Sequence, residues 1–473
     1  MKVYFILGIL FCSIGSYAQD IGRQILEREL DRNHYDEVLR GVDSLYRIEG
    51  KSSDLLFYEG KANEGMLRYK AAYRCYSEWL ERDSSDRDAR LALARVAALA
   101  GWTMKAVDIY EQLAGEDSLD FFVNYQLARL YQQIGKTVRA IGIYDRLYQT
   151  DTTNVTLLKR IGDCYNRIGW SMNAVDHYLR AFCLDPEDGE TVVKAVNLMM
   201  ANTVLFPDFI GQSGPLVDTA LIYSPRLNAL KQLRGILYYL SRRYFDCETT
   251  FEELIAQGDS TRVNFKYLGL ALFHMNRFKE AVVPLAIADS LFQDDWGNRL
   301  DPELSMRYGE TLGKCRETEK AMKVLGEIER QMMPDTLMLY RLAFLRGNAC
   351  EEVDKREQAV CHYWRAYKLK EDNKNIIYTL MSFHCGLWTV EGRRRQASEE
   401  EVSKSLFFHV LFLQKMKALS SGERHYFNGL SGDILRKELD ELFFRQEATL
   451  VVVDPDGKKY TYSADEMREL IKP

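Results

Sequence analysis

Along most of this sequence, apolar residues recur every three or four positions, which is the spacing of one face of an amphipathic helix. The pattern also repeats over a longer interval. Four segments align without a gap when they begin at Ser53, Arg87, Phe121 and Val155, which gives a period of 34 residues. Each segment reads as two amphipathic helices joined by a tight turn, so the pattern predicts a tandem array of helix pairs.

Four positions of the repeat carry recurring residue types. They are Gly60, Ala94, Ala128 and Gly162 at the eighth position; Gly101, Gly135 and Gly169 at the fifteenth; Ala72, Ala106, Ala140 and Ala174 at the twentieth; and Tyr76, Tyr110, Tyr144 and Tyr178 at the twenty-fourth. Small residues at the eighth and twentieth positions let the two helices approach closely. Glycine at the fifteenth supplies a turn conformation that other residues adopt at a cost. The tyrosine is expected to fill space against the next unit.

This pattern resembles the tetratricopeptide (TPR) repeat family, whose units are 34-residue helix pairs. The register extends back to Gln19 in a degenerate first unit. A second block begins at Asn228 and Arg262, and looser units follow near Pro302 and Tyr340. The resemblance covers residues 19–370 and implies an all-α fold, a TPR-type helix-turn-helix superhelix (α-solenoid).

The sequence divides into six regions. The predicted boundaries are a signal peptide at 1–18, a first TPR block at 19–188, a broken repeat at 189–227, a second TPR block at 228–370, a helical C-terminal region at 371–448, and a β-hairpin with a short helix at 449–473. The break is predicted because Phe206-Pro207 and the segment 211–215 interrupt the pattern. The hairpin is predicted from Thr449 to Val453 and Lys459 to Tyr462 around a turn at 454–457, and we expect it to cap the array.

The first 18 residues indicate export. Lys2 supplies a positive start, Val3 to Ile14 is a short apolar stretch, and Ser16-Tyr17-Ala18 offers small residues for cleavage before Gln19. The apolar stretch is too short to span a bilayer, and we expect no stable membrane insertion after cleavage. The sequence therefore resembles an exported bacterial TPR-containing protein, located in the periplasm or on the periplasmic side of the outer membrane.

Composition and motifs exclude several functions. The formal charge of −6 offers no basic excess for nucleic acid, so we expect no nucleic-acid partner. The eight cysteines beyond residue 18 are scattered, show no Cys-x-x-Cys pair and predict neither a metal site nor a disulfide pairing. No nucleotide-binding, metalloprotease or nucleophile-elbow motif occurs. We therefore expect no enzyme activity, no cofactor and no metal.

The resemblance also implies where a partner would bind. Stacked TPR units form an inner surface from their first helices, and positions two, five, nine and twelve of each unit face it. In the first three complete units these residues are Asp54, Phe57, Lys61 and Glu64; Asp88, Leu91, Arg95 and Ala98; and Phe122, Tyr125, Arg129 and Gln132. The candidate partner-binding residues are the aromatic anchors Phe57, Tyr125 and Tyr239 and the cations Arg95, Arg129 and Lys159.

These residues favour a non-catalytic scaffold or adaptor that binds a segment of an envelope protein. The cations are expected to hold acidic groups or backbone carbonyls of that segment. Two alternatives stay open. Tyrosine-rich inner surfaces can also stack sugars, which makes a glycan partner an alternative, and the array could be a purely structural component of an envelope complex.

Overall fold

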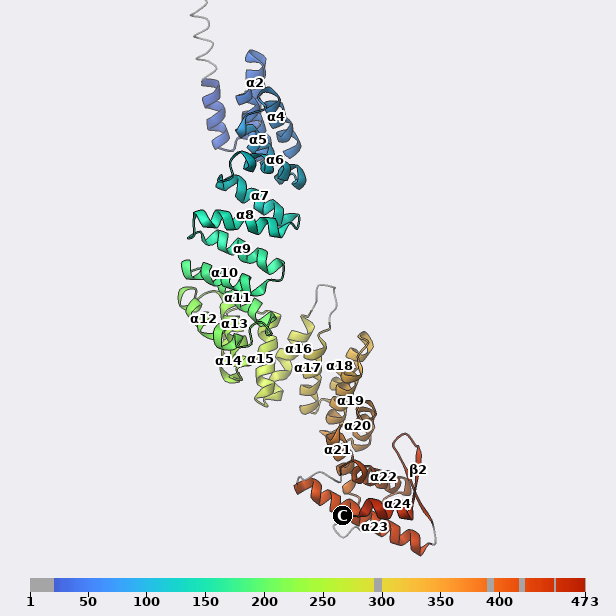
Figure 1. Ribbon diagram of the computed structural model, residues 1–473. Coiled ribbons are helices and arrows are strands. Elements are labelled where there is room, and N and C mark those ends of the chain that lie inside the picture. Colours follow the sequence, from blue (N-terminus) through green and yellow to red (C-terminus); the bar gives the residue numbers. More distant parts are fainter. Residues whose placement is uncertain (1–20, 293–299, 389–394, 417–421, 446–447, 473) are drawn as a thin grey trace, which may run out of the picture. The chain divides into compact units, whose positions relative to one another are not determined.

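The computed structural model describes residues 21–292, 300–388, 395–416, 422–445 and 448–472. The chain divides into two compact units, the first ending at Leu230 and the second beginning at Lys231, so that the division falls within one helix. The predicted signal peptide at 1–18 lies outside the described residues. The predicted fold class is confirmed: both units are built from helices stacked in chain order, and one small hairpin lies near the C-terminus (Figure 1).

The first unit consists of paired helices in which each helix packs on the next. Its helices are residues 21–31, α2 (Tyr35–Glu49), α3 (Ser53–Gly65), α4 (Tyr69–Arg82), α5 (Arg87–Leu99), α6 (Thr103–Glu116), α7 (Phe121–Gln133), α8 (Thr137–Thr150), α9 (Val155–Arg167), α10 (Ser171–Leu184), α11 (Gly189–Ala201) and α12 (Phe209–Tyr223).

The second unit continues with helix pairs and ends in a mixed segment. Its elements are α13 (Asn228–Leu240), α14 (Tyr244–Ala256), α15 (Arg262–His274), α16 (Phe278–Ser290), α17 (Pro302–Lys314), α18 (Thr318–Gln331), α19 (Thr336–Glu351), α20 (Arg356–Leu369), α21 (Lys374–Cys385), α22 (Glu399–Met416), α23 (Gly422–Phe444), β1 (Thr449–Val453), β2 (Lys459–Ser463) and α24 (Ala464–Ile471).

The two helices of a repeat meet where a ring fills the space left by a small residue. A Cβ atom built on Gly162 would lie 2.7 Å from Cε1 of Tyr178, and one on Gly347 would lie 2.6 Å from Cε1 of Tyr363. No side chain larger than hydrogen fits these positions without a shift of the ring. The tyrosine therefore packs first on the eighth residue of its own unit. Its other side meets the next unit, where Nζ of Lys194 lies 5.6 Å from the centre of the Tyr178 ring.

In nine of the helix pairs, the fifteenth residue has positive φ whether or not it is glycine. The predicted glycines Gly101, Gly135 and Gly169 have φ of 77°, 78° and 80°. The fifteenth residue of six other units is not glycine and still has positive φ. These residues are Asn33, Leu67, Arg242, Asn276, Arg316 and Asp354, with φ between 59° and 64°. Because this conformation strains a residue with a Cβ atom, the packing of the two helices must impose it.

Aspartate and asparagine are the N-cap residues of many of the first helices. The side chains of Asp86, Asp120 and Asn154 accept hydrogen bonds from backbone N–H groups of α5, α7 and α9. Some N-cap carboxylates also form an ion pair with a cation of the preceding first helix. Asp120 pairs with Arg87, and Asp301 pairs with Arg262. An ion pair of this kind joins one repeat to the next.

Residues 189–227 form a helix pair, although the sequence pattern is broken there. Pro215 lies inside α12, where it removes one backbone donor, and the helix continues on both sides of it. The connection 202–208 is long, and among these residues, all of which are described, none has positive φ. The deviation from the repeat therefore lies in the turn.

The C-terminal hairpin forms as predicted and packs against the helices of the second unit. Thr449 of β1 pairs with Ser463 of β2, and Ser463 and Glu466 form the capping box that begins α24. The carboxylate of Asp456 in the turn accepts a hydrogen bond of 2.8 Å from Nε1 of Trp364 and pairs with Lys368 at 2.7 Å. These contacts attach the hairpin to α20, the last helix of the repeat array.

A substitution at Gly162 tests the contact between the helices of a repeat. Gly162→Leu should lower the free energy of unfolding by about 1–3 kcal/mol because the new side chain overlaps the Tyr178 ring. The matched control is Gly142→Leu in α8, where nothing lies within 4 Å of a Cβ atom. There, higher helix propensity should raise stability by up to about 1 kcal/mol. Urea unfolding measures both, and equal effects would contradict the packing argument.

Candidate functional site

Two adjoining hollows in the first unit are lined mainly by first helices of successive repeats. One, of about 610 Å³, is bordered by residues 27–35, by α3 and by the start of α4. The other, of about 560 Å³, is bordered by α3, α5 and Phe122 of α7. Phe57, Tyr58 and Lys61 line both hollows, so the two adjoin at α3. We call the combined surface the first-unit groove.

The groove coincides with the inner-facing positions expected from the repeat. Residues at positions two, five and nine that line it are Asp54, Phe57, Lys61, Asp88, Leu91, Arg95 and Phe122. Tyr58 and Trp79 also line the groove, although neither was predicted from the sequence. Tyr58 occupies the sixth position, and Trp79 comes from the second helix of its repeat, so neither follows from the first-helix pattern. The acidic residues of helix 21–31 were missed because that unit is degenerate in sequence.

Aromatic rings form the centre of the groove. Phe57 makes edge contacts with Tyr58 and Trp79, with ring centres 5.4 and 5.9 Å apart. Nζ of Lys61 lies 5.8 Å from the centre of the Phe57 ring. Burial lowers the pKa of Lys61, and the positive charge of Arg95 lowers it further. An apolar or cationic side chain of a partner would therefore meet a preformed aromatic surface.

Two of the predicted cations are bound within the protein. The guanidinium of Arg95 pairs with Glu64 of the preceding repeat at 2.8 Å, and Lys159 pairs with Asp188 of the following repeat at 2.7 Å. Burial alone would raise the pKa of Asp188, but hydrogen bonds from Lys159 and Thr191 hold it below its ordinary value. These cations join repeats and are less available to hold an acidic partner than the sequence analysis expected.

The remaining candidates lie apart from Phe57 and Arg95. Tyr125 of α7 stacks on Phe121 with ring centres 5.9 Å apart, and the exposed Arg129 donates to Gln126 at 3.0 Å. Tyr239 belongs to the second unit, where its hydroxyl group is 3.2 Å from Nε2 of His274. The structure thus brings Phe57 and Arg95 into one groove, while Tyr239 lies in a separate unit.

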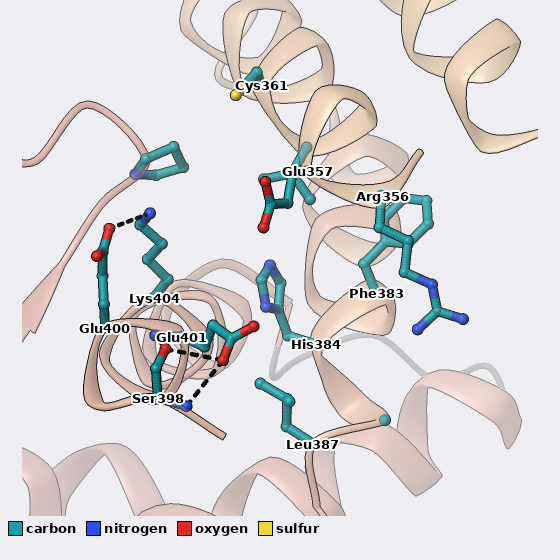
Figure 2. Close-up of a pocket in the computed structure, with 13 residues that line it drawn as sticks. Arg356, Glu357, Cys361, Phe383, His384, Leu387, Ser398, Glu400, Glu401 and Lys404 are labelled. Carbon is teal, nitrogen blue, oxygen red and sulfur yellow. Dashed lines mark hydrogen bonds and ion pairs between the residues drawn. The ribbon is translucent and has the colours of Figure 1, made fainter. Parts of the chain in front are cut away.

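A second pocket, of about 660 Å³, lies in the second unit between α20, α21, α22 and the hairpin turn (Figure 2). Most of its polar groups have structural partners. Glu401 accepts hydrogen bonds from the backbone N and Oγ of Ser398 at 2.9 and 2.8 Å, and Lys404 pairs with Glu400 at 2.7 Å. The Ser398 and Lys404 contacts stabilise the first turns of α22.

Two histidines beside this pocket are held in low-dielectric surroundings. His384 stacks on Phe408 with ring centres 4.7 Å apart, and its Nε2 is buried without a hydrogen-bond partner. Burial and the nearby Lys404 lower the pKa of His384 to about 4. His409 is fully buried against Ser431, and burial lowers its pKa to about 3. Both rings are therefore neutral near pH 7, and His409 belongs to the packed interior while His384 lines the pocket.

Across the residues that the structure describes, no three His, Cys, Asp or Glu side chains are placed to bind a metal ion. The cysteines from Cys75 onward are all free, and Cys183 and Cys361 are exposed. In the described ranges, no helix has both the length and the apolar character needed to cross a membrane.

Several solved structures are similar to this chain in their helix-pair fold. No family model and no curated protein matches the chain. Among solved structures, it is similar to the C-terminal part of a TPR repeat-containing protein from Cytophaga hutchinsonii, with 13% identity and a TM-score of 0.45 over 52% of this chain and 99% of that one. It is similar to YrrB, a TPR protein with an unusual peptide-binding site, with 18% identity and a TM-score of 0.36 over 43% and 96% of the two chains.

A third similar structure is that of Naa15/Naa10 bound to HypK-THB, with 11% identity and a TM-score of 0.38 over 90% of this chain and 67% of that one. At such low identities the likeness concerns the helix-pair fold alone. The class that the present fold defines is a TPR-type α-solenoid.

Acidification should destabilise the second unit through its buried histidines. Because their pKa values are lowered in the folded state, their full contribution to stability is present above the ordinary pKa of 6.5 and is lost as pH falls toward 4. For His384 the shift corresponds to about 3 kcal/mol. Urea unfolding between pH 7 and pH 4 should show a shallower pH dependence for His384→Phe than for the wild type.

The control for that measurement is His425→Phe, which changes an exposed histidine of α23. It should keep the pH dependence of the wild type. If His384→Phe also keeps it, protonation of His384 does not contribute to the acid sensitivity.

Proposed function

We propose that this protein is a non-catalytic scaffold of the bacterial envelope that binds an extended or helical segment of a partner protein in the first-unit groove. The observation that carries the proposal is that the two hollows adjoin along α3, where Phe57, Tyr58 and Lys61 line both. Two adjoining hollows along one helix suit a chain segment better than they suit a compact small molecule.

The groove offers what a protein segment needs for binding. Aromatic rings at its centre provide contact area at a low cost in conformational entropy, and polar side chains at its edges can fix the register of the segment. At its far end, the ring of Phe122 is 49% exposed. Because the groove is built from helices whose separation is set by the packed tyrosines, little ordering of the protein would be required on binding.

The aromatic cluster of the second unit gives less support to the glycan alternative. Tyr239 packs against Tyr244, Tyr267 and His274, with ring centres 5.8, 5.3 and 5.7 Å apart. These contacts leave less of the Tyr239 ring free to stack on a sugar. Exposed flat platforms are the arrangement that would favour a glycan partner.

The envelope location rests on the sequence of residues 1–18. With the apolar stretch removed by cleavage after Ala18, the remaining chain would act in the periplasm or on the periplasmic side of the outer membrane. Its partner would then be an envelope protein.

Site-specific photo-crosslinking in the producing cells tests the groove. A benzophenone amino acid in place of Phe122 should give a covalent adduct with one partner protein. The matched control replaces Trp170, another exposed aromatic residue of the first unit, which does not line the groove. We expect no such adduct at position 170. The same adducts at both positions, or an adduct at position 170 alone, would contradict binding in the groove.

A further inference from the structure

The first-unit groove carries an excess of negative charge. The carboxylates among its lining residues are Glu27, Asp31, Asp54, Glu64, Asp86 and Asp88, and the cations are Lys61 and Arg95. This balance differs from the expectation drawn from the sequence, in which cations of the groove hold acidic or carbonyl groups of a partner.

Internal ion pairs neutralise some of these groups and still leave an excess of negative charge. Arg95 is neutralised by Glu64, while Asp54 is neutralised by Arg23 from helix 21–31. One carboxylate oxygen of Asp86 accepts hydrogen bonds from the backbone N–H groups of residues 88 and 89. The carboxylate keeps its negative charge. Among the lining residues, this leaves the cation Lys61 and the carboxylates Glu27, Asp31, Asp86 and Asp88.

Three carboxylates of the groove are available to a ligand. Glu27, Asp31 and Asp88 are exposed, and their carboxylates make no hydrogen bond or ion pair within the described part of the chain. They lie on both sides of the central rings, Glu27 and Asp31 by the first hollow and Asp88 by the second. The negative field reaches the aromatic centre, because Glu27 and Asp54 add to the effect of burial in raising the pKa of Tyr58.

We propose that the first-unit groove selects a basic segment, in which lysine or arginine residues alternate with apolar ones. Apolar or guanidinium groups of the segment pack on the rings of Phe57 and Tyr58, and its cations reach Glu27, Asp31 and Asp88. Lys61 is then free to donate to a backbone carbonyl group of the segment. This inference rests on the proposed function and adds the chemistry of the partner.

Charge complementarity of this kind acts on both affinity and selectivity. Attraction between opposite charges at the rim of an interface speeds association, and this attraction weakens as the salt concentration rises. Repulsion between like charges excludes wrong partners. An acidic segment would place its carboxylates against Glu27, Asp31, Asp86 and Asp88 and is therefore disfavoured.

Selection from a random-peptide phage library on the full chain tests the inference. Peptides whose binding is lost in Phe57→Ala should carry a net positive charge. Because Phe57 packs on Trp79, Phe122→Ala serves as a second groove variant whose exposed ring contributes little to folding. Circular dichroism establishes that both variants are folded.

The synthetic form of a selected peptide is then titrated by fluorescence anisotropy. The double variant Glu27→Gln/Asp88→Asn should bind it about three- to tenfold more weakly, as expected for the loss of two partly screened charge contacts. The matched control Glu81→Gln/Asp108→Asn removes the same two charge types from exposed positions of α4 and α6 and should leave the affinity unchanged.

The outcomes separate the inference from the proposed function. Groove-dependent peptides that are neutral or acidic would overturn the basic preference and leave a protein-binding groove in place. An equal loss of affinity in both double variants would also overturn it, since charge at the groove would then have no special effect. The absence of any peptide that depends on Phe57 or Phe122 would overturn both proposals.

Discussion

The rest of this structure depends on the contact between the small eighth residue of a repeat and the large side chain sixteen positions later, which is a ring in most repeats and Leu285 or Leu325 in two. Where glycine occupies the eighth position, as at Gly162 and Gly347, the tyrosine ring fills the volume of the missing side chain. This contact fixes the distance between the two helices of a repeat. It also accounts for the turn, since Leu67 and Arg242 adopt positive φ without being glycine. With helix separation and turn fixed, the face that each first helix presents to the groove is determined.

A second constraint joins successive repeats and changes the chemistry of the inner surface. Cations such as Arg95 and Lys159 pair with carboxylates of the adjacent repeat. The ion pairs contribute modestly to stability because they are partly exposed. Their larger effect is on recognition, because they remove positive charge that a partner would otherwise meet. The first-unit groove is consequently acidic around an aromatic centre.

Much of the fold followed from the sequence because it is encoded locally and repeatedly. The register set by Tyr76, Tyr110, Tyr144 and Tyr178 located the helix pairs, and the turn residues around Gly457 located the hairpin. The pairing of Arg95 with Glu64 did not follow, since it depends on how two repeats pack. Nor did the continuation of α12 through Pro215, because the neighbouring helix α11 stabilises a segment that local preference disfavours. For the site, the first-helix positions identified Phe57 and Arg95 but could not place Tyr239 in a separate unit.

The most direct test of the account is hydrogen exchange of the full chain with and without the partner segment recovered by crosslinking at position 122. Binding in the first-unit groove should slow amide exchange in α3 and α5, residues 53–65 and 87–99, because these helices line both sides of the bound segment. Slowed exchange confined to α9–α12 or to the second unit would contradict the central claim that the first helices of the early repeats form the binding surface.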